Sequence, residues 1–322
     1  MTNIRQRNLG LDLARMTEAT ALQAGRWMGL GNRLKADAAA TQAMLEGLNE
    51  LEVDGCIVVG EEGRHELGSP FQTGSRVGNG RGPEMDVVLD PIDGTRLVLE
   101  GRPGAISVLG MTPRGSVWSP TAGVYMEKIV VDRDVGSALV PECIDAPAAW
   151  TLALIARIKH KELRDLVVFV LDRPRHANLI EEIRMAGARV ALHNEGDIGG
   201  AILAASPDSN VDVLMGVGGV AEGVTAACAV KALGGSILGR LSPQTDQEQE
   251  QVALAGLDLN QVVTCDDLVR SDEIYFAATG VTDGPLLDGV QYHRGRAKTH
   301  TLVLRAETGI YREIRAERMV EN

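Results

Sequence analysis

Segments with the pattern of buried strands alternate with segments of helical periodicity between residues 166 and 238, and this alternation constrains the fold most strongly. A continuous apolar run at 166–171 predicts a strand, and amphipathic spacing at 176–186 predicts a helix; a further strand is predicted at 211–215 and a further helix at 221–233. The same alternation continues at three further segments, a strand at 189–192, a helix at 197–205 and a strand at 235–238. Such alternation is typical of a parallel or mixed sheet covered by helices on both faces. The second half of the chain is therefore predicted to be α/β.

The first half has a different pattern. Helical spacing at 9–29 and 36–51 predicts two helices, and short apolar runs at 56–59 and 85–89 predict strands. Further strand-like runs follow at 105–111, 116–118, 122–131 and 137–140. We interpret these runs as an antiparallel meander. The pattern changes after residue 147, so we expect an N-terminal half over 1–150 and a C-terminal half over 151–322.

Two parts of the C-terminal half stand outside the alternation. The polar stretch SPQTDQEQEQ at 242–251 is predicted to be an exposed loop, and the apolar runs at 274–278 and 299–305 predict two final strands. Their place in a sheet is not indicated by the pattern. The chain contains no internal repeat that would suggest an array of similar units.

The charge of the chain excludes two classes of partner. The formal net charge is −12, and Lys and Arg are scattered rather than clustered. A nucleic acid or an anionic membrane surface would be repelled by such a chain. The four cysteines form no CxxC pair, which is typical of a reducing compartment. No run reaches the roughly 18 apolar residues that span a bilayer, so we expect a cytoplasmic protein.

The stretch VLDPIDGTR places two carboxylates on a tight corner. Asp90 follows a buried strand, Asp93 lies beyond Pro91, and Gly94 lets the backbone approach a ligand closely. One interpretation is a turn capped by aspartate that leads into a helix. The other is a cation site, because Mg²⁺ is usually held by one or two carboxylates together with water and phosphate oxygens. The stretch alone leaves both open.

Three other acidic positions have comparable surroundings. Glu61 follows the strand at 56–59, Asp37 begins a helix, and Glu222 lies between a strand and a helix. Taken singly, Glu61 fits a solvated loop, and Asp37 fits the preference of helix N-termini for acids. The residues before Glu222, GVGGVA, loosely match a dinucleotide-binding fingerprint. An acid at that helix start would repel a pyrophosphate, which argues against this alternative.

Many spaced motifs together resemble one family. DPIDGT looks like the signature of the lithium-sensitive, metal-dependent sugar and inositol phosphatases. Within that superfamily the chain resembles the class II (GlpX-type) fructose-1,6-bisphosphatases along almost its whole length. The supporting stretches, in chain order, are RMTEATALQAGRWMG, KADAAAT, IVVGEEG, GNGRGPEMDVVLDPIDGTR, YMEK, RPRH, EGD, VGGVAEGV and FAATGVTDGPLL.

The resemblance implies a fold and a set of functional residues. It implies a layered α-β-α-β-α sandwich and hydrolysis of the 1-phosphate of fructose-1,6-bisphosphate, with sedoheptulose-1,7-bisphosphate as a second substrate in photosynthetic relatives. Implied metal ligands, for Mn²⁺ or Mg²⁺, are Asp37, Glu61, Asp90, Asp93 and Glu222. Implied substrate contacts are Asp93, Gly94, Thr95, Tyr125, Arg173, Pro174, Arg175, His176, Glu195, Gly196, Asp197 and Gly219. A cytoplasmic homo-oligomer, a dimer or a tetramer, is also implied.

The chain departs from the family pattern at two positions. The signature often has Glu where this chain has Asp93, which is one methylene shorter. The order Glu61-Glu62-Gly63 is also altered, so either glutamate could be the ligand, and we choose Glu61.

The expected chemistry explains the residue types. Two cations roughly 3.5–4 Å apart can activate a water and stabilise the leaving oxygen of a phosphate ester. Asp90 would hold a cation, Thr95 would position the water or the phosphoryl group, and the N–H groups after Gly94 could form an anion cradle. Arg173 and Arg175 offer guanidinium groups to a second phosphate. An inositol or nucleotide monophosphatase would not need them, and that activity is the alternative within the same class.

Overall fold

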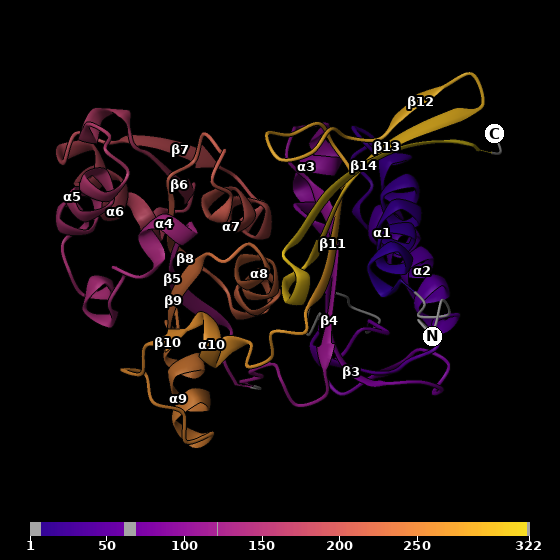
Figure 1. Cartoon of the computed structure of the whole chain (residues 1–322), viewed down its shortest axis with the longest axis horizontal. Helices are drawn as coiled ribbons and strands as arrows, with labels where there is room; N and C mark the ends of the chain where they lie inside the picture. Colours follow the sequence, from indigo (N-terminus) through magenta and orange to yellow (C-terminus); the bar gives the residue numbers. More distant parts are fainter. Residues whose placement is uncertain (1–7, 61–68, 121, 321–322) are drawn as a thin grey trace.

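The computed structural model describes residues 8–60, 69–120 and 122–320, which form five layers (Figure 1). Helices α1 (Leu9–Gly25) and α2 (Arg33–Asn49) cover the outer face of the first sheet. Helices α7 (Asp197–Ala205) and α8 (Val220–Ala232) lie between the sheets, and α5 (Ala148–Ile158) and α6 (Ala177–Met185) cover the second sheet from outside. The predicted α/β class and its α-β-α-β-α layering are confirmed.

The first sheet contains eight strands in the order β12-β13-β11-β4-β3-β1-β2, with β14 paired to β13. Only β1 and β3 run parallel to each other; the other pairs are antiparallel. The bounds are β1 (Asp54–Val59), β2 (Arg76–Val77), β3 (Glu84–Asp93), β4 (Ile106–Pro113), β11 (Tyr275–Gly280), β12 (Gln291–His293), β13 (Arg296–Arg305) and β14 (Ile310–Met319).

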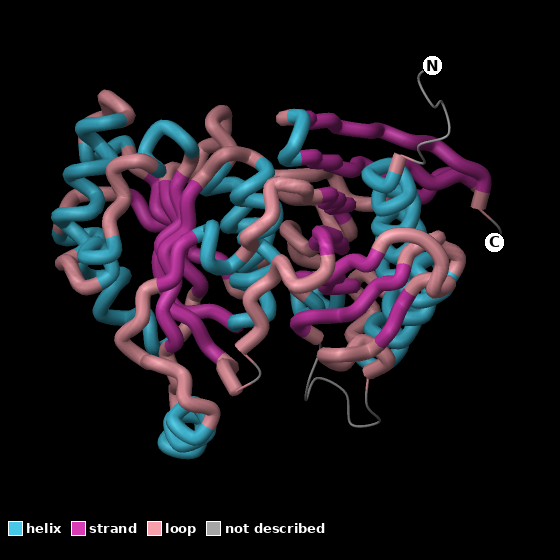
Figure 2. The backbone as a smooth tube through the Cα atoms, turned by 60° about the horizontal axis from the view of Figure 1, so that its bottom comes forward, coloured by secondary structure: helices cyan, strands magenta, loops and turns pink. Residues whose placement is uncertain are grey.

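The second sheet has the order β10-β9-β5-β8-β6-β7 and is mixed, as the alternation predicted. Strand β6 is parallel to β7 and β8, whereas β5 is antiparallel to β8 and β9. Figure 2 shows these strands nearly edge-on, with helices on both sides. The bounds are β5 (Tyr125–Val131), β6 (Val167–Leu171), β7 (Arg189–His193), β8 (Val213–Gly219), β9 (Ser236–Leu241) and β10 (Val263–Thr264).

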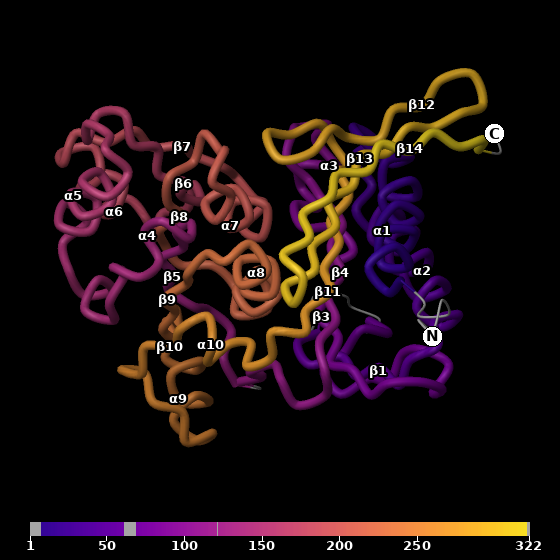
Figure 3. The backbone as a smooth tube through the Cα atoms, in the orientation of Figure 1, coloured from indigo at the N-terminus to yellow at the C-terminus, as the bar shows by residue number. Residues whose placement is uncertain are grey.

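The two sheets divide the chain differently from the predicted halves. Strands β4 and β5, which we expected to neighbour each other in one meander, belong to different sheets, so that prediction is wrong. The chain enters the second sheet at β5 and returns to the first at β11, which lies beside β4 (Figure 3). The boundary proposed at residue 150 therefore does not coincide with the division between the sheets. Strand patterns reveal strands but not their partners.

Three local predictions are wrong for identifiable reasons. Residues 116–118 contribute only the isolated bridge between Val117 and Val269. The region at 137–140 follows α4 (Arg133–Gly136), a short helix begun by the Asp132 side chain, which accepts from two backbone N–H groups. The stretch predicted as a loop contains α9 (Asp246–Leu254), because Thr245 caps it by accepting from the Glu248 N–H at 3.2 Å.

The remaining helices are short. They are the α-helices α3 (Thr95–Glu100) and α10 (Cys265–Leu268), and the 3₁₀ turns Pro141–Ile144, Leu163–Asp165, Pro174–His176 and Ala306–Thr308. In the described part of the chain, no helix combines the length and the apolar character needed to cross a membrane.

Small side chains allow α8 to lie between both sheets. Ala226, Ala227, Cys228 and Ala229 are all buried in one cluster that reaches Val88 of the first sheet and Met126 of the second. Because these side chains are short, the helix axis can approach strands on two sides, which a Leu-rich helix could not do without overpacking. The low aromatic content of the chain is compatible with this close central layer.

Asp212 is a fully buried carboxylate that links neighbouring segments beside the second sheet. It accepts hydrogen bonds from Lys159 Nζ at 2.9 Å, Lys161 Nζ at 2.6 Å and the Val167 N–H at 2.9 Å. Burial alone would raise the pKa of Asp212, but the bonds from Lys161, Lys159 and Val167 together outweigh it and lower that pKa. The ionised form is therefore the one that stabilises the fold.

We expect Asp212→Asn to lower the free energy of unfolding by about 1–3 kcal/mol at pH 7, since the partly buried Lys159 and the exposed Lys161 lose a charged acceptor. Because the folded pKa lies below the unfolded value of about 3.9, this contribution is present above pH 4. It is lost as the pH falls through the folded pKa. Urea unfolding at several pH values measures both effects. Asp165→Asn, in an exposed pair with Arg189, is the control and should change little. Equal stability of the two variants would contradict the prediction.

Candidate active site

One cavity of about 800 Å³ collects most of the residues that the sequence singled out. Its lining includes Asp37, Asp90, Asp93, Gly94, Thr95, Tyr125, Arg173, Arg175, Glu195, Gly196, Asp197, Gly219 and Glu222. Glu61 and Glu62 lie outside the described residues. Pro174 and His176 are not part of the lining. Residues from both sheets and from helices between them therefore meet at one place.

The DPID motif is the end of strand β3 rather than a turn after it, which corrects the sequence interpretation. The register between β3 and β4 shifts between Asp90 and Asp93, as it does at a β-bulge. In a regular strand, residues three apart point to opposite faces. The irregularity lets both carboxylates line the same cavity, and Asp90 Oδ1 accepts from the Ile92 N–H at 3.0 Å.

Asp93 is held by the N-terminus of α7. Its Oδ2 accepts from the N–H groups of Ile198 and Gly199, both at 3.1 Å. Burial raises the pKa of Asp93 well above its ordinary value, the nearby Asp90 raises it further, and the Gly199 N–H opposes both. The site thus concentrates negative charge in a buried position.

Thr95 is the first residue of α3 and reaches another predicted ligand. Its hydroxyl donates to Asp37 Oδ1 at 3.2 Å. Arg33 Nε lies 3.3 Å from the second oxygen of Asp37 and also lines the cavity, although sequence reasoning gave it no role. The spacing of four residues on one helix was the signal that could have found this pair. Arg33 therefore brings a positive charge to the carboxylate side of the cavity.

The N–H groups at the start of α3 are partly occupied, which corrects the expected anion cradle. The Arg96 N–H donates to Glu195 Oε2 at 2.9 Å, and the Leu97 N–H donates to the Gly94 carbonyl at 2.9 Å. These donors are therefore not available to a phosphate in this arrangement.

The glycines of the GVGGVA stretch allow two carboxylates to pack directly against the backbone. A Cβ on Gly218 would collide with Asp197, and one on Gly219 would collide with Glu222. Both acids thus lie directly over the backbone that a dinucleotide fingerprint would offer to a pyrophosphate. This placement disfavours the dinucleotide alternative, since phosphate and carboxylates repel.

The RPRH segment contains a half-buried Arg173, an exposed Arg175 and a buried His176. Arg175 donates from Nε and Nη2 to the Val217 carbonyl, at 3.1 and 2.7 Å, and its guanidinium carbon lies 5.1 Å from the Tyr125 ring centroid. Arg173 also lines the cavity. These contacts hold the Arg175 guanidinium beside Tyr125 at the edge of the cavity.

His176 is placed behind the cavity rather than in it. Its Nδ1 lies 2.6 Å from the Leu171 carbonyl, and its Nε2 accepts from the Val217 N–H at 2.8 Å. Both ring nitrogens are thus satisfied by backbone groups, and burial lowers the pKa of the imidazole. The neutral ring with a proton on Nδ1 connects β6 to β8, and Pro174 begins the 3₁₀ turn that leads to it.

Lys128 is a residue that sequence reasoning missed. Its side chain is 1% exposed and forms an ion pair with Asp197. The signal was a lysine directly before the apolar run Ile129–Val131, where a buried charge is rare unless it is paired. Asp197 therefore lines the cavity and at the same time forms an ion pair with Lys128, which is buried beneath the cavity.

The donor set of the cavity fits a hard divalent cation. Asp37, Asp90, Asp93 and Glu222 offer only carboxylate oxygens, which Mg²⁺ and Mn²⁺ prefer. Burial, and after it the charge of Asp90, raises the pKa of Asp93, so a nearby cation would favour the ionised form of this carboxylate. Within residues 8–60, 69–120 and 122–320, however, no group of three or more His, Cys, Asp or Glu side chains is arranged to hold one metal ion.

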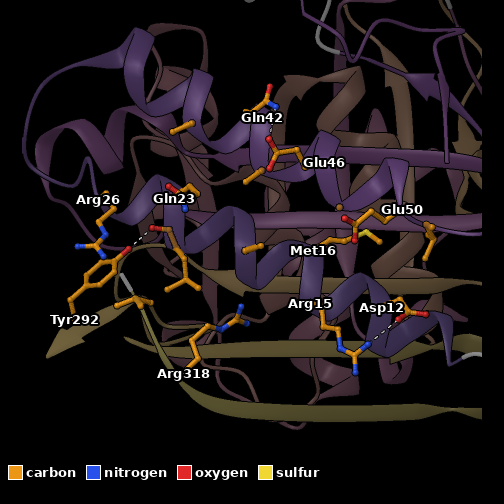
Figure 4. A pocket seen from close by; sticks show the side chains of 17 residues that line it. Asp12, Arg15, Met16, Gln23, Arg26, Gln42, Glu46, Glu50, Tyr292 and Arg318 are labelled. Atoms are coloured by element: carbon orange, nitrogen blue, oxygen red, sulfur yellow. Dashed lines mark hydrogen bonds and ion pairs between the residues drawn. The ribbon is translucent and has the colours of Figure 1, made fainter. Parts of the chain in front are cut away.

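A second cavity, of about 780 Å³, lies against α1 and α2 and contains none of the predicted site residues (Figure 4). Its charged groups make contacts among themselves: Arg15 Nη1 lies 3.3 Å from Asp12 Oδ1, and the Arg26 guanidinium carbon lies 4.3 Å from the Tyr292 ring centroid. It therefore lacks the unbalanced negative charge of the first cavity.

Comparison with known proteins gives a consistent result. Residues 7–318 match the family model described as bacterial fructose-1,6-bisphosphatase, glpX-encoded. A class 2 fructose-1,6-bisphosphatase of Haemophilus influenzae is 37% identical over 96% of both chains. Fructose-1,6-bisphosphatase 1 class 2 of Escherichia coli K12 is 35% identical over 97% of this chain and 95% of the relative.

Solved structures with similarity include an inositol monophosphatase from Anabaena and a SuhB protein from Bartonella henselae. The first has a TM-score of 0.35 and 15% identity, and the match covers 79% of this chain and 98% of the other. The second has a TM-score of 0.35 and 10% identity, with 61% and 73% covered.

Proposed function

The chain belongs to the bacterial, glpX-encoded fructose-1,6-bisphosphatase family, and on that premise we propose that its carboxylate-rich cavity hydrolyses the 1-phosphate of fructose-1,6-bisphosphate. One observation carries the proposal: the carboxylates at the end of β3 and the arginines after β6 line the same cavity. A substrate with a phosphate at each end needs both a site of reaction and a separate cationic contact.

Membership of the family implies dependence on a divalent cation, and we propose Mg²⁺ or Mn²⁺ held by Asp37, Asp90, Asp93 and Glu222, with Glu61 as a fifth ligand. When bound, such cations supply Lewis-acid stabilisation of phosphoryl oxygens and lower the pKa of water. The protein contributes the fixed oxygen donors that orient the phosphate ester.

Thr95 and Asp37 form a unit that can orient the attacking water. The Thr95 hydroxyl has two acceptors for its proton, Asp37 Oδ1 at 3.2 Å and the Ile92 carbonyl at 3.4 Å, and its oxygen keeps lone pairs that can accept a hydrogen bond. A hydroxyl held in this way can accept from a water molecule in the cavity and align it for attack. Asp37 in turn is oriented by Arg33.

Arg175 and Arg173 are proposed to bind the second phosphate, with Tyr125, Asp197 and Gly219 around the sugar. The Arg175 guanidinium is held by the Val217 carbonyl and the Tyr125 ring, so it loses little freedom when it binds. The buried His176 supports this loop from below, and the exposed Pro174 begins its 3₁₀ turn. Sedoheptulose-1,7-bisphosphate carries the same two phosphates and is proposed as a further substrate; a cytoplasmic homo-oligomer is proposed for the assembled enzyme.

The direct test is phosphate release from fructose-1,6-bisphosphate with Mg²⁺, with Mn²⁺ and with a chelator. The proposal expects release only with a cation. Faster release from inositol phosphate or a nucleoside monophosphate would instead favour the monophosphatase alternative.

We expect Arg175→Ala to raise the KM for the bisphosphate about 10- to 100-fold, since a hydrogen bond to a charged group contributes about 1.5–3 kcal/mol. The KM for a sugar monophosphate should change little, because that substrate has no second phosphate for Arg175 to contact. Initial-rate kinetics on both substrates measure the difference. Arg189→Ala, at an exposed pair outside the cavity, is the matched control. Equal changes in KM for both substrates would contradict the proposal that Arg175 binds the second phosphate.

A further inference from the structure

Two loops of the site share one local design although they come from different sheets. Asp93-Gly94-Thr95 runs from the last residue of β3 to the first residue of α3, and Glu195-Gly196-Asp197 leads from β7 into the first residue of α7. Each glycine is the N-cap of its helix in the left-handed region, with φ 95° and ψ 45° at Gly94 and φ 92° and ψ 46° at Gly196. Residues with a Cβ rarely adopt this conformation.

Neither helix is capped by a side chain of its own N-cap residue. Instead, each loop's acid reaches across to the other helix. Asp93 Oδ2 accepts from the N–H groups of Ile198 and Gly199 in α7, and Glu195 Oε2 accepts from the Arg96 N–H in α3. Helix N-termini favour carboxylates because their first N–H groups lack intrahelical partners. The two contacts together form a reciprocal cap between the two sheets.

We propose that Glu195 is a positioning residue: it fixes the start of α3, and with it the Thr95 hydroxyl, relative to the half of the molecule that carries Arg173 and Arg175. This inference rests on the proposed function of Thr95 in catalysis, but the cap itself does not. The Glu195 carboxylate belongs to the loop after β7, whereas Thr95 begins α3, shortly after β3. The contact from Glu195 to the Arg96 N–H therefore makes the position of Thr95 depend on the distance between the two sheets.

If Glu195 instead bound a sugar hydroxyl directly, its substitution would have different kinetic effects. A residue that positions Thr95 affects the rate of the chemical step, whereas a hydroxyl ligand acts on ground-state binding as well. A glutamine keeps an acceptor for the Arg96 N–H, and an alanine does not. The pair of substitutions therefore separates loss of the cap from loss of the charge.

The first readout needs no substrate and no metal. Hydrogen–deuterium exchange at Arg96 should become about tenfold or more faster in Glu195→Ala, because the amide loses its acceptor and local opening costs less. In Glu195→Gln the rate should stay close to that of the parent protein. Glu181→Ala, an exposed position on α6, is the control and should leave Arg96 exchange unchanged. Unchanged exchange in Glu195→Ala would overturn the cap.

The second readout is kinetic. With fructose-1,6-bisphosphate, Glu195→Ala should lower kcat about 10- to 100-fold, the scale of a misplaced catalytic group, with KM changed less than twofold, and Glu195→Gln should restore most of kcat. A higher KM with unchanged kcat in both variants would overturn the positioning role in favour of hydroxyl binding. If the parent protein released no phosphate, the proposed function would fail while faster Arg96 exchange would still establish the cap.

Discussion

We expect Asp90→Asn to lower the rate of cation-dependent phosphate release by about a hundredfold or more, since even partners one shell beyond a metal ligand contribute about 10- to 100-fold. Asp90 is buried at the end of β3, and its Oδ1 is already turned towards the Ile92 N–H. The amide keeps the size and the acceptor oxygen of the carboxylate but removes the negative charge. The measurement is the initial rate of phosphate release from fructose-1,6-bisphosphate across a range of Mg²⁺ and Mn²⁺ concentrations.

The control for Asp90→Asn is Glu84→Gln at the exposed first residue of the same strand. It removes one negative charge from β3 without touching the cavity, so it should leave the rate within about twofold, as surface substitutions usually do little. If Asp90→Asn retained full activity with either cation, Asp90 would not be a ligand. If its rate recovered only at high cation concentration, the loss would be one of cation affinity, as expected of a ligand.

We expect Asp197→Asn to lower the free energy of unfolding by about 3–5 kcal/mol, the usual cost of leaving one partner of a buried ion pair uncompensated. The Lys128 ammonium is fully buried beneath the cavity, and Asp197 is its ion-pair partner. Once that carboxylate is neutral, the ammonium stays in a low-dielectric environment without an anion. Urea unfolding followed by circular dichroism measures the change in the absence of added metal.

A paired variant distinguishes loss of the ion pair from loss of shape. Lys128→Met combined with Asp197→Leu should recover most of the stability, because replacing both members of a buried pair by apolar residues is often neutral. Asp145→Asn, in an exposed pair with Arg240, is the control and should cost less than about 1 kcal/mol. A small effect of Asp197→Asn, similar to that of the control, would show that water reaches Lys128.

Local patterns in the sequence were sufficient for the elements that are built from local contacts. The helix at 197–205 and the apolar strands β6 and β8 follow directly from their periodicity. The family motifs also indicated which acids and arginines would meet, because several of them, such as DPIDGT and RPRH, stand at the end of a strand, where functional side chains often gather.

The features that the sequence could not indicate are those that depend on contacts between distant segments. The bulge at Asp90–Asp93 is recognisable only from the register with β4, and the cap from Glu195 to Arg96 joins residues on different sheets. Lys128 was visible as a charge directly before an apolar run, but its partner Asp197 is brought there by α7. Thr245 was overlooked as a helix cap because the residues after it are uniformly polar and gave no apolar periodicity.

The return of the last strands to the first sheet has a consequence for biosynthesis. Residues 125–264, which contain β5 to β10, form a continuous segment, whereas β4 must wait for β11. A chain that emerges from the ribosome N-terminus first can therefore complete the second sheet while the apolar edge of β4 is still unpaired. Unpaired edges of this kind invite association between nascent chains. The strand that carries Asp90 and Asp93 is among the first to be synthesised, and its sheet is among the last structures to close.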